Sequence, residues 1–192
     1  MYPRERLDAL SDAIFGVAMT LLVLDVRLPE SFEAHDAREL LHGLAGLAPK
    51  FWPYVLSFYV LGIRWLSNVE VRSHGEVYGR EYARWWLLYL LLITCVPLTT
   101  IIVGRFGNMA PAIWLYAGNT ILISAVAFRM TALTPEIEQG EPLRRRRLSL
   151  IVLMGSSALA IAWSLIETHY ALWAMALNVA VPVMTRWGRQ PK

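Results

Sequence analysis

The stretch SDAIFGVAMTLLVLDV, residues 11–26, holds twelve uncharged residues between Asp12 and Asp25. A helix rises about 1.5 Å per residue, so the uncharged run covers roughly 18 Å of a hydrocarbon layer about 30 Å thick. That is too short to cross a bilayer alone. We therefore expect one or both aspartates at or inside the membrane boundary, where an acid normally faces protein or water and marks a functional position.

The composition indicates a polytopic membrane protein rather than a soluble domain. Of 192 residues, 56% are hydrophobic and only 17% are charged, and the chain carries eight Trp and eight Tyr. The net charge of +3 could suggest nucleic acid, but the basic residues form short clusters between apolar runs. Membrane orientation explains those clusters better, so no nucleic-acid partner is expected. A single cysteine, Cys95, excludes an intrachain disulfide framework.

Six apolar runs predict an all-α fold of six transmembrane helices in a single domain, residues 1–192. Lys and Arg concentrate at both ends and in the second and fourth connections. The positive-inside rule then predicts that both termini are cytoplasmic, in a plasma or inner cell membrane, and no signal peptide is assigned. The runs cover 11–28, 51–68, 84–104, 109–131, 147–166 and 169–186.

Two further features concern local structure. Leucines at helical spacing in the connection 29–50, from Leu40 to Leu47, predict a short amphipathic helix at the outer surface. Asn119 and Asn178 lie deep in apolar runs, where an unpaired amide is costly, so each is expected to form an interhelical hydrogen bond.

No enzyme motif is present: the sequence contains no HExxH, GxSxG, Walker loop or GxGxxG. The four histidines fall in predicted loops or helix ends. We therefore assign no catalytic residue, no cofactor and no metal site.

One narrow face of the first run is a candidate pore wall. At 100° per residue, Ala13, Val17, Thr20 and Leu24 fall within about 60° of one another. We call these four residues the first-helix face. Their spacing fits either a packing seam against another helix or the side of a water-filled path, and the flanking aspartates favour the path.

The segment RLDALSDAIFGVAMTLLVLDVRLP, residues 6–29, resembles the first span of the transmembrane protein 175 family of potassium channels. The family signature is Arg, three residues, then Phe-Ser-Asp, followed by an apolar helix ending in Leu-Glu or Leu-Asp. Arg6, Ser11 and Asp12 match this signature, whereas Leu10 stands at the position of the Phe.

The resemblance implies a six-helix subunit that assembles as a homotetramer, with first helices lining a central pore for K⁺. The family's narrowing residues stand five, eight and twelve positions after the motif Asp, which here are Val17, Thr20 and Leu24. Helical spacing selects the same face. Val17 is shorter than the Ile or Leu usual in the family, and Asn68 replaces a His that commonly follows the second span's Trp, here Trp65.

Each aspartate then has an expected role. Asp12 is expected to lie buried at the cytoplasmic end of the pore helix, in a polar network with Arg6 and Ser11. Arg6 and Asp12 are about 120° apart on a helix, so their direct partners are expected on another helix or subunit. Asp25 is expected at the outer mouth, where a ring of carboxylates would concentrate cations, or alternatively as a solvated helix end paired with Arg27.

The sequence therefore predicts a potassium-selective or weakly selective cation channel with an apolar constriction, whose partners are its own copies, K⁺ and the lipid bilayer. Two alternatives stay open. A proton-coupled transporter would use Asp12 or Asp25 as a titrating carrier. A non-conducting scaffold or lipid-binding protein would explain the aromatic and basic clusters without a pore.

Overall fold

The protein is a bundle of long α-helices, and the computed structural model describes residues 2–70, 77–133 and 141–166. Two-residue strands precede the first helix and the fourth. The elements are β1 Tyr2–Pro3, α1 Arg4–Leu21, the 3-10 turn η1 Leu22–Asp25, α2 Ala37–Ala45, α3 Ala48–Glu70, β2 Val77–Tyr78, α4 Arg80–Phe106, α5 Ala110–Ala132 and α6 Glu141–Ser164.

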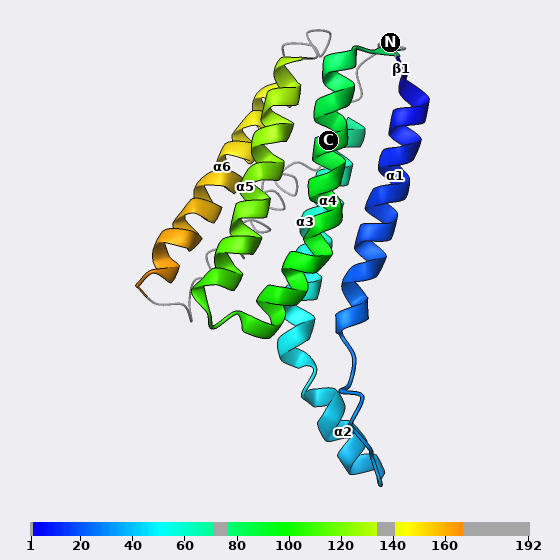
Figure 1. Ribbon diagram of the computed structural model, residues 1–192, viewed down its shortest axis with the longest axis vertical. Helices are drawn as coiled ribbons and strands as arrows, with labels where there is room; N and C mark the ends of the chain where they lie inside the picture. The colour runs from blue at the N-terminus through cyan, green and yellow to red at the C-terminus, as the bar shows by residue number, and fades with distance from the viewer. Residues whose placement is uncertain (1, 71–76, 134–140, 167–192) are drawn as a thin grey trace, which may run out of the picture.

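The long helices run alternately up and down the bundle, with α1 at one edge and α6 at the other (Figure 1). The antiparallel pairing of β1 with β2 holds the start of α1 beside the start of α4. We call this end of the bundle the β end, and the opposite end, beyond which α2 extends, the α2 end. Contacts between α1 and both α3 and α4, and between α4 and α5, close the core.

Four segments are long and apolar enough to cross a membrane: Arg4–Asp25, Arg80–Phe106, Ala110–Ala132 and Arg146–Ser164. The chain is accordingly a multi-pass membrane protein. The predicted second run forms α3, a helix of 23 residues, but this helix is not among the four and carries Arg64 in its interior. The sixth predicted run, with Asn178, lies outside the described residues.

The core is apolar at its centre and continues into a column of aromatic rings. Phe15, Leu22, Leu61 and Ile93 are almost completely buried where α1, α3 and α4 meet. The column is formed by successive ring pairs with centroid distances of 4.3, 5.7, 5.9 and 6.2 Å, through Tyr78, Tyr82, Trp86, Tyr89 and Phe15.

Several buried polar groups are paired between helices. As predicted, Asn119 makes an interhelical hydrogen bond: its Nδ2 donates to the Leu92 carbonyl at 3.3 Å. Between α3 and α4, the Thr100 hydroxyl donates to Ser57 Oγ at 2.8 Å, and Tyr116 of α5 lies 3.1 Å from the same Ser57 oxygen. Such bonds satisfy polar side chains where water is absent.

The predicted amphipathic helix is present as α2. The Asp36 carboxylate accepts a hydrogen bond from the Glu39 backbone N–H at 2.7 Å, and the Glu39 carboxylate accepts one from the His35 N–H at 2.8 Å. This reciprocal arrangement satisfies N–H groups that a helix start leaves unpaired. Leu40, Leu41 and Leu44 are exposed on α2, and the position of this helix at the outer membrane surface stays a prediction.

Candidate functional site on the first helix

Helix α1 has one packed face and one uncovered face. The packed face consists of Ser11, Phe15, Ala18 and, in η1, Leu22, all of them buried. On the first-helix face, Val17 is 58% exposed and Leu24 62% exposed, and Ala13 and Thr20 are exposed as well. The predicted face therefore packs against no helix of this subunit within the described residues.

The two faces follow from the helical repeat. The packed residues recur at intervals of four, three and four, as do those of the first-helix face, and the two sets lie about 180° apart around the axis. Helix α1 lies at the edge of the bundle (Figure 1). Since one side of α1 packs in the core, its other side faces outward. An outward apolar side in a membrane protein is covered by lipid, by another subunit or by a pore.

The ends of α1 differ from the predicted run of 11–28. The helix begins at Arg4, so its charged first turns are part of it. An ion pair between Arg4 Nε and Asp8 Oδ2 at 3.3 Å supports these turns. It ends at Leu21 and tightens into η1, which contains Leu24. Leu24 nevertheless stays exposed.

Thr20 places an oxygen between the two apolar side chains. Its hydroxyl donates to the Val17 carbonyl at 2.8 Å. Since the proton of the hydroxyl is used within the helix, the oxygen lone pairs are directed away from that bond. Thr20 can therefore act as an acceptor or a cation ligand on the uncovered face.

Asp12 is bonded to another helix, as its position suggested. Trp65 Nε1 of α3 donates to Asp12 Oδ1 at 2.8 Å. Ser11 is buried and Arg6 is exposed, and the expected polar network of these two residues with Asp12 stays a prediction. Asp12 itself is exposed in the single subunit rather than buried, because it lies beside Ala13 at the border of the uncovered face.

Asn68 has its own partners at the position where it departs from the family pattern. Its Nδ2 donates to the Tyr89 hydroxyl at 3.3 Å, and its Oδ1 accepts from Arg146 Nη2 at 3.0 Å. An amide can both donate and accept, so Asn68 joins α3 to α4 and α6 without a charge of its own.

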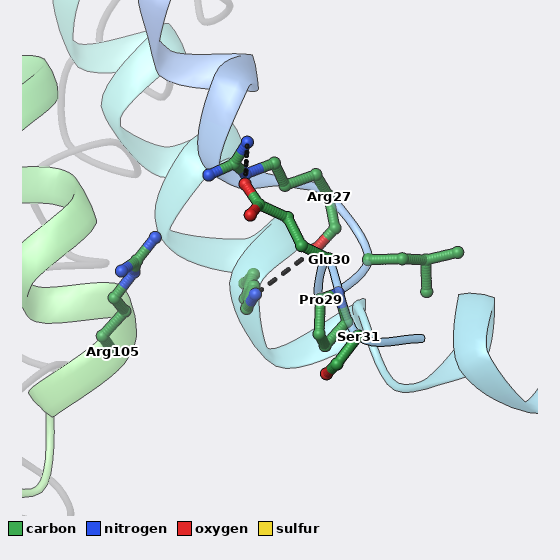
Figure 2. Close-up of a pocket in the computed structure, with 7 residues that line it drawn as sticks. Arg27, Pro29, Glu30, Ser31 and Arg105 are labelled. Atoms are coloured by element: carbon green, nitrogen blue, oxygen red, sulfur yellow. Dashed lines mark hydrogen bonds and ion pairs between the residues drawn. The ribbon is translucent and has the colours of Figure 1, made fainter. Parts of the chain in front are cut away.

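A pocket of about 550 Å³ opens at the α2 end of the bundle, beside the end of η1 (Figure 2). Its lining comes from the loop after η1, the start of α3 and the end of α4. We call it the basic pocket, because three of its seven residues are cationic: Arg27, Leu28, Pro29, Glu30, Ser31, Lys50 and Arg105.

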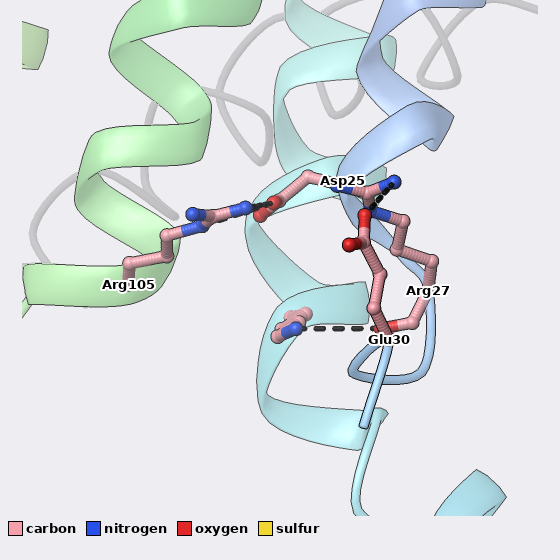
Figure 3. Close-up of polar contacts among 5 residues, drawn as sticks. Asp25, Arg27, Glu30 and Arg105 are labelled. Carbon is pink, nitrogen blue, oxygen red and sulfur yellow. Dashed lines mark hydrogen bonds and ion pairs between the residues drawn. The ribbon is translucent and has the colours of Figure 1, made fainter. Parts of the chain in front are cut away.

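Asp25 lies next to this pocket and is held by α4 (Figure 3). Arg105 donates to Asp25 Oδ1 from Nε at 3.0 Å and from Nη2 at 2.5 Å. The alternative prediction of an Arg27 partner is wrong, because the Arg27 guanidinium instead reaches Glu30 at 3.4 Å. The Asp25 side chain is 9% exposed, so its charge is neutralised within the subunit instead of standing free at a mouth.

Three polar residues of this framework were not found from the sequence: Trp65, Arg105 and Arg64. Arg64 is buried between α3 and α5, where Nη2 contacts Ser124 Oγ at 3.0 Å and Nη1 has no hydrogen-bond partner among the residues that the structure describes. A charge inside the apolar run 51–68 was the available signal for Arg64. Trp65 and Arg105 carried no comparable signal, since their partners are 53 and 80 residues away.

Comparison with known proteins relates this chain to one family. The model of the family described as "Endosomal/lysosomal potassium channel TMEM175" matches residues 6–97. A potassium channel of Streptomyces collinus is 34% identical over 101 residues, which are 53% of this chain and 48% of that protein. A potassium channel of Chamaesiphon minutus is 27% identical over 128 residues, 65% of this chain and 63% of that protein. The predicted resemblance is confirmed.

Further comparisons concern the fold and more distant relatives. The human endosomal/lysosomal proton channel TMEM175 is 29% identical over 100 residues, which are 50% of this chain and 20% of the human protein. The chain thus spans less than two thirds of the length of these curated relatives. The crystal structure of a lysosomal potassium-selective channel TMEM175 homolog from Chamaesiphon minutus superposes with a TM-score of 0.78 at 23% identity, covering 94% of this chain and 96% of the other. This likeness shows the fold.

Proposed function

We propose, on the premise that residues 6–97 carry the TMEM175 family sequence, that this protein is the subunit of a potassium-permeable cation channel with α1 as its pore-lining helix. The observation that carries the proposal is the uncovered first-helix face. The residues that the family resemblance selects as pore-lining are those that no helix of the described subunit covers. The potassium channel names of two bacterial relatives support the choice of ion.

In the proposed assembly, four copies of the single domain 1–192 surround an axial pore in the cell membrane, with both termini cytoplasmic. The pore then carries rings of Val17, Thr20 and Leu24. K⁺ acts as the permeating ion, not as a cofactor.

The proposed mechanism is partial dehydration at apolar rings, since apolar constrictions control permeation through the ease of wetting. K⁺ gives up water at lower cost than Na⁺, so a narrow apolar ring favours K⁺. The Thr20 oxygens, whose protons are used on the Val17 carbonyl, offer partial replacement ligands between the rings. Because Val17 is a short side chain, this ring is wide and the expected preference for K⁺ is weak.

The test is ion flux into liposomes that contain the purified protein, with K⁺, Na⁺ and H⁺ gradients compared. Val17→Ile narrows the ring and should raise the K⁺ over Na⁺ ratio, whereas Val17→Asn and Leu24→Ala should lower it. Leu91→Ala is the matched control, because Leu91 of α4 is 59% exposed, close to the 62% of Leu24. Unchanged selectivity and conductance in all three face variants would remove α1 from the ion path.

Proton conduction is the second candidate function. The vertebrate relatives, which include the human protein, are named proton channels. The H⁺ gradient in the same liposomes separates the two candidates: a proton pathway carries current without K⁺ or Na⁺, and a potassium pathway does not.

A further inference from the structure

Among the described residues, the lining of the basic pocket carries more positive than negative charge. Arg27, Lys50 and Arg105 line it, and Glu30 is the one carboxylate of its lining. With the adjacent Asp25 included, three cations face two carboxylates (Figures 2 and 3). A concave site with surplus positive charge attracts anions.

Two of the cations are only loosely engaged. In the part of the chain that the structure describes, the Lys50 ammonium makes one contact, to the Arg27 carbonyl at 3.4 Å. The Arg27 and Glu30 side chains are 64% and 86% exposed and 3.4 Å apart, an arrangement that contributes little to stability. Both Lys50 and Arg27 can therefore turn toward an incoming anion without breaking a strong bond.

The third cation is fixed in place. Arg105 binds Asp25 through Nε and Nη2, which orients the guanidinium while leaving its remaining donors free among the described residues. A guanidinium has five N–H donors, so two bonds to a carboxylate do not exhaust it. The pocket thus combines one preorganised donor with two adaptable ones, and hydrogen bonds from such cations to a phosphate are strong.

The surroundings of the pocket are typical of the membrane–water interface, the level of lipid headgroups. Trp52, two residues after Lys50, is 74% exposed, and Phe51 is 50% exposed. Exposed Trp is typical of the membrane–water interface. The amphipathic helix α2 lies at the same end of the bundle (Figure 1). The abundant anionic group at that depth is a phosphate diester.

We propose that the basic pocket binds a phosphate group through Arg27, Lys50 and Arg105, and that the phosphate belongs to the headgroup of an anionic phospholipid such as phosphatidylglycerol. A volume of about 550 Å³ is in the range of small-molecule sites and accommodates a phosphate with its glycerol. This site is separate from the first-helix face and does not depend on conduction.

The test is native mass spectrometry of the purified protein in detergent, titrated with phosphatidylglycerol, with diacylglycerol as the phosphate-free probe, and with inorganic phosphate as competitor. The unmodified protein should retain phosphatidylglycerol and not diacylglycerol. Arg27→Ala/Lys50→Ala should weaken retention about fivefold for each cation removed. Arg38→Ala, which removes an exposed cation of α2 outside the pocket, should leave retention unchanged.

The outcomes separate the sources of phosphate. Displacement of the lipid by equimolar inorganic phosphate would assign the same pocket to free phosphate and overturn the lipid assignment. Equal retention of diacylglycerol, or full retention by the double variant, would overturn the phosphate site itself. If the double variant fails to fold, lipid retention is measured on Lys50→Gln instead. This single variant disturbs only a 3.4 Å contact to a carbonyl. Since no ion flux is measured, a non-conducting protein can still bind the lipid.

Discussion

The ion pair between Asp25 and Arg105 fixes η1, the turn after α1, to the end of α4. Asp25→Ala would leave Arg105 without its carboxylate, and we expect a loss of about 1–2 kcal/mol because Arg105 is itself half exposed. A lower midpoint of thermal unfolding in detergent measures this effect. Glu30→Ala is the control: it removes a carboxylate from an exposed pair nearby and should cost less than about 0.5 kcal/mol. Equal shifts would show that the Asp25 pair is not an anchor.

Arg64 is a buried charge with an incomplete set of partners. Ser124→Ala removes the 3.0 Å partner of Nη2 and should destabilise the protein by about 1–3 kcal/mol, since this buried charged donor then keeps only a 3.5 Å contact to the Thr120 carbonyl. Arg64→Met/Ser124→Ala should be more stable than Ser124→Ala alone, because methionine fills the space without a donor. The free energies of unfolding of Arg64→Met, Ser124→Ala and the double variant together give the coupling free energy between the two residues. Additive effects would contradict the contact.

At the scale of the element, α2 depends on its first turn. The Asp36 carboxylate caps the helix through the Glu39 N–H, so Asp36→Ala should destabilise α2 by about 1 kcal/mol. Faster hydrogen exchange of the amides in Ala37–Ala45, without faster exchange in α4, measures this local effect. Arg38→Ala, in the same turn, should leave exchange unchanged, and equal acceleration in both variants would rule out the cap.

Element positions were largely predictable because long apolar runs make helices in a membrane. The boundaries of the helices were less predictable. The segment from Arg4 to Asp8 is charged and was expected to lie outside the first run, but an ion pair between its two ends supports a helix there. The tightening into η1 carried no sequence signal. It places Leu24 in a 3-10 turn instead of a regular helix.

At the scale of the whole molecule, the proposed assembly predicts which exposed residues meet water. In a Cys95→Ser background, Val17→Cys should react with a water-soluble thiol reagent because position 17 faces the proposed pore. Leu91→Cys should not react, because position 91 is on α4, outside the first-helix face, although Leu91 is similarly exposed in the single subunit. Mass spectrometry of protein in liposomes measures the modification. Protection of Val17→Cys together with reaction of Leu91→Cys would reverse the proposed arrangement of subunits.

The limits of sequence reasoning are clearest at this scale. Ala13, Val17 and Thr20 share a face because the helical repeat of α1 brings them together, whereas the exposure of Leu24 depends on the 3-10 turn η1 that follows. The partner of Asp25 depends on how α1 and α4 pack across 80 residues of chain, and the partner of Asp12 on packing across 53. No local pattern encodes such distances. Arg27, adjacent in sequence, was the natural but wrong choice.

The aromatic column from Tyr78 to Phe15 also gives the fold an optical signature. Rings held at centroid distances from 4.3 to 6.2 Å in a fixed, chiral order couple their electronic transitions. Their near-ultraviolet circular dichroism should therefore report whether β2, α4 and α1 remain docked together, even in preparations where no current can be recorded.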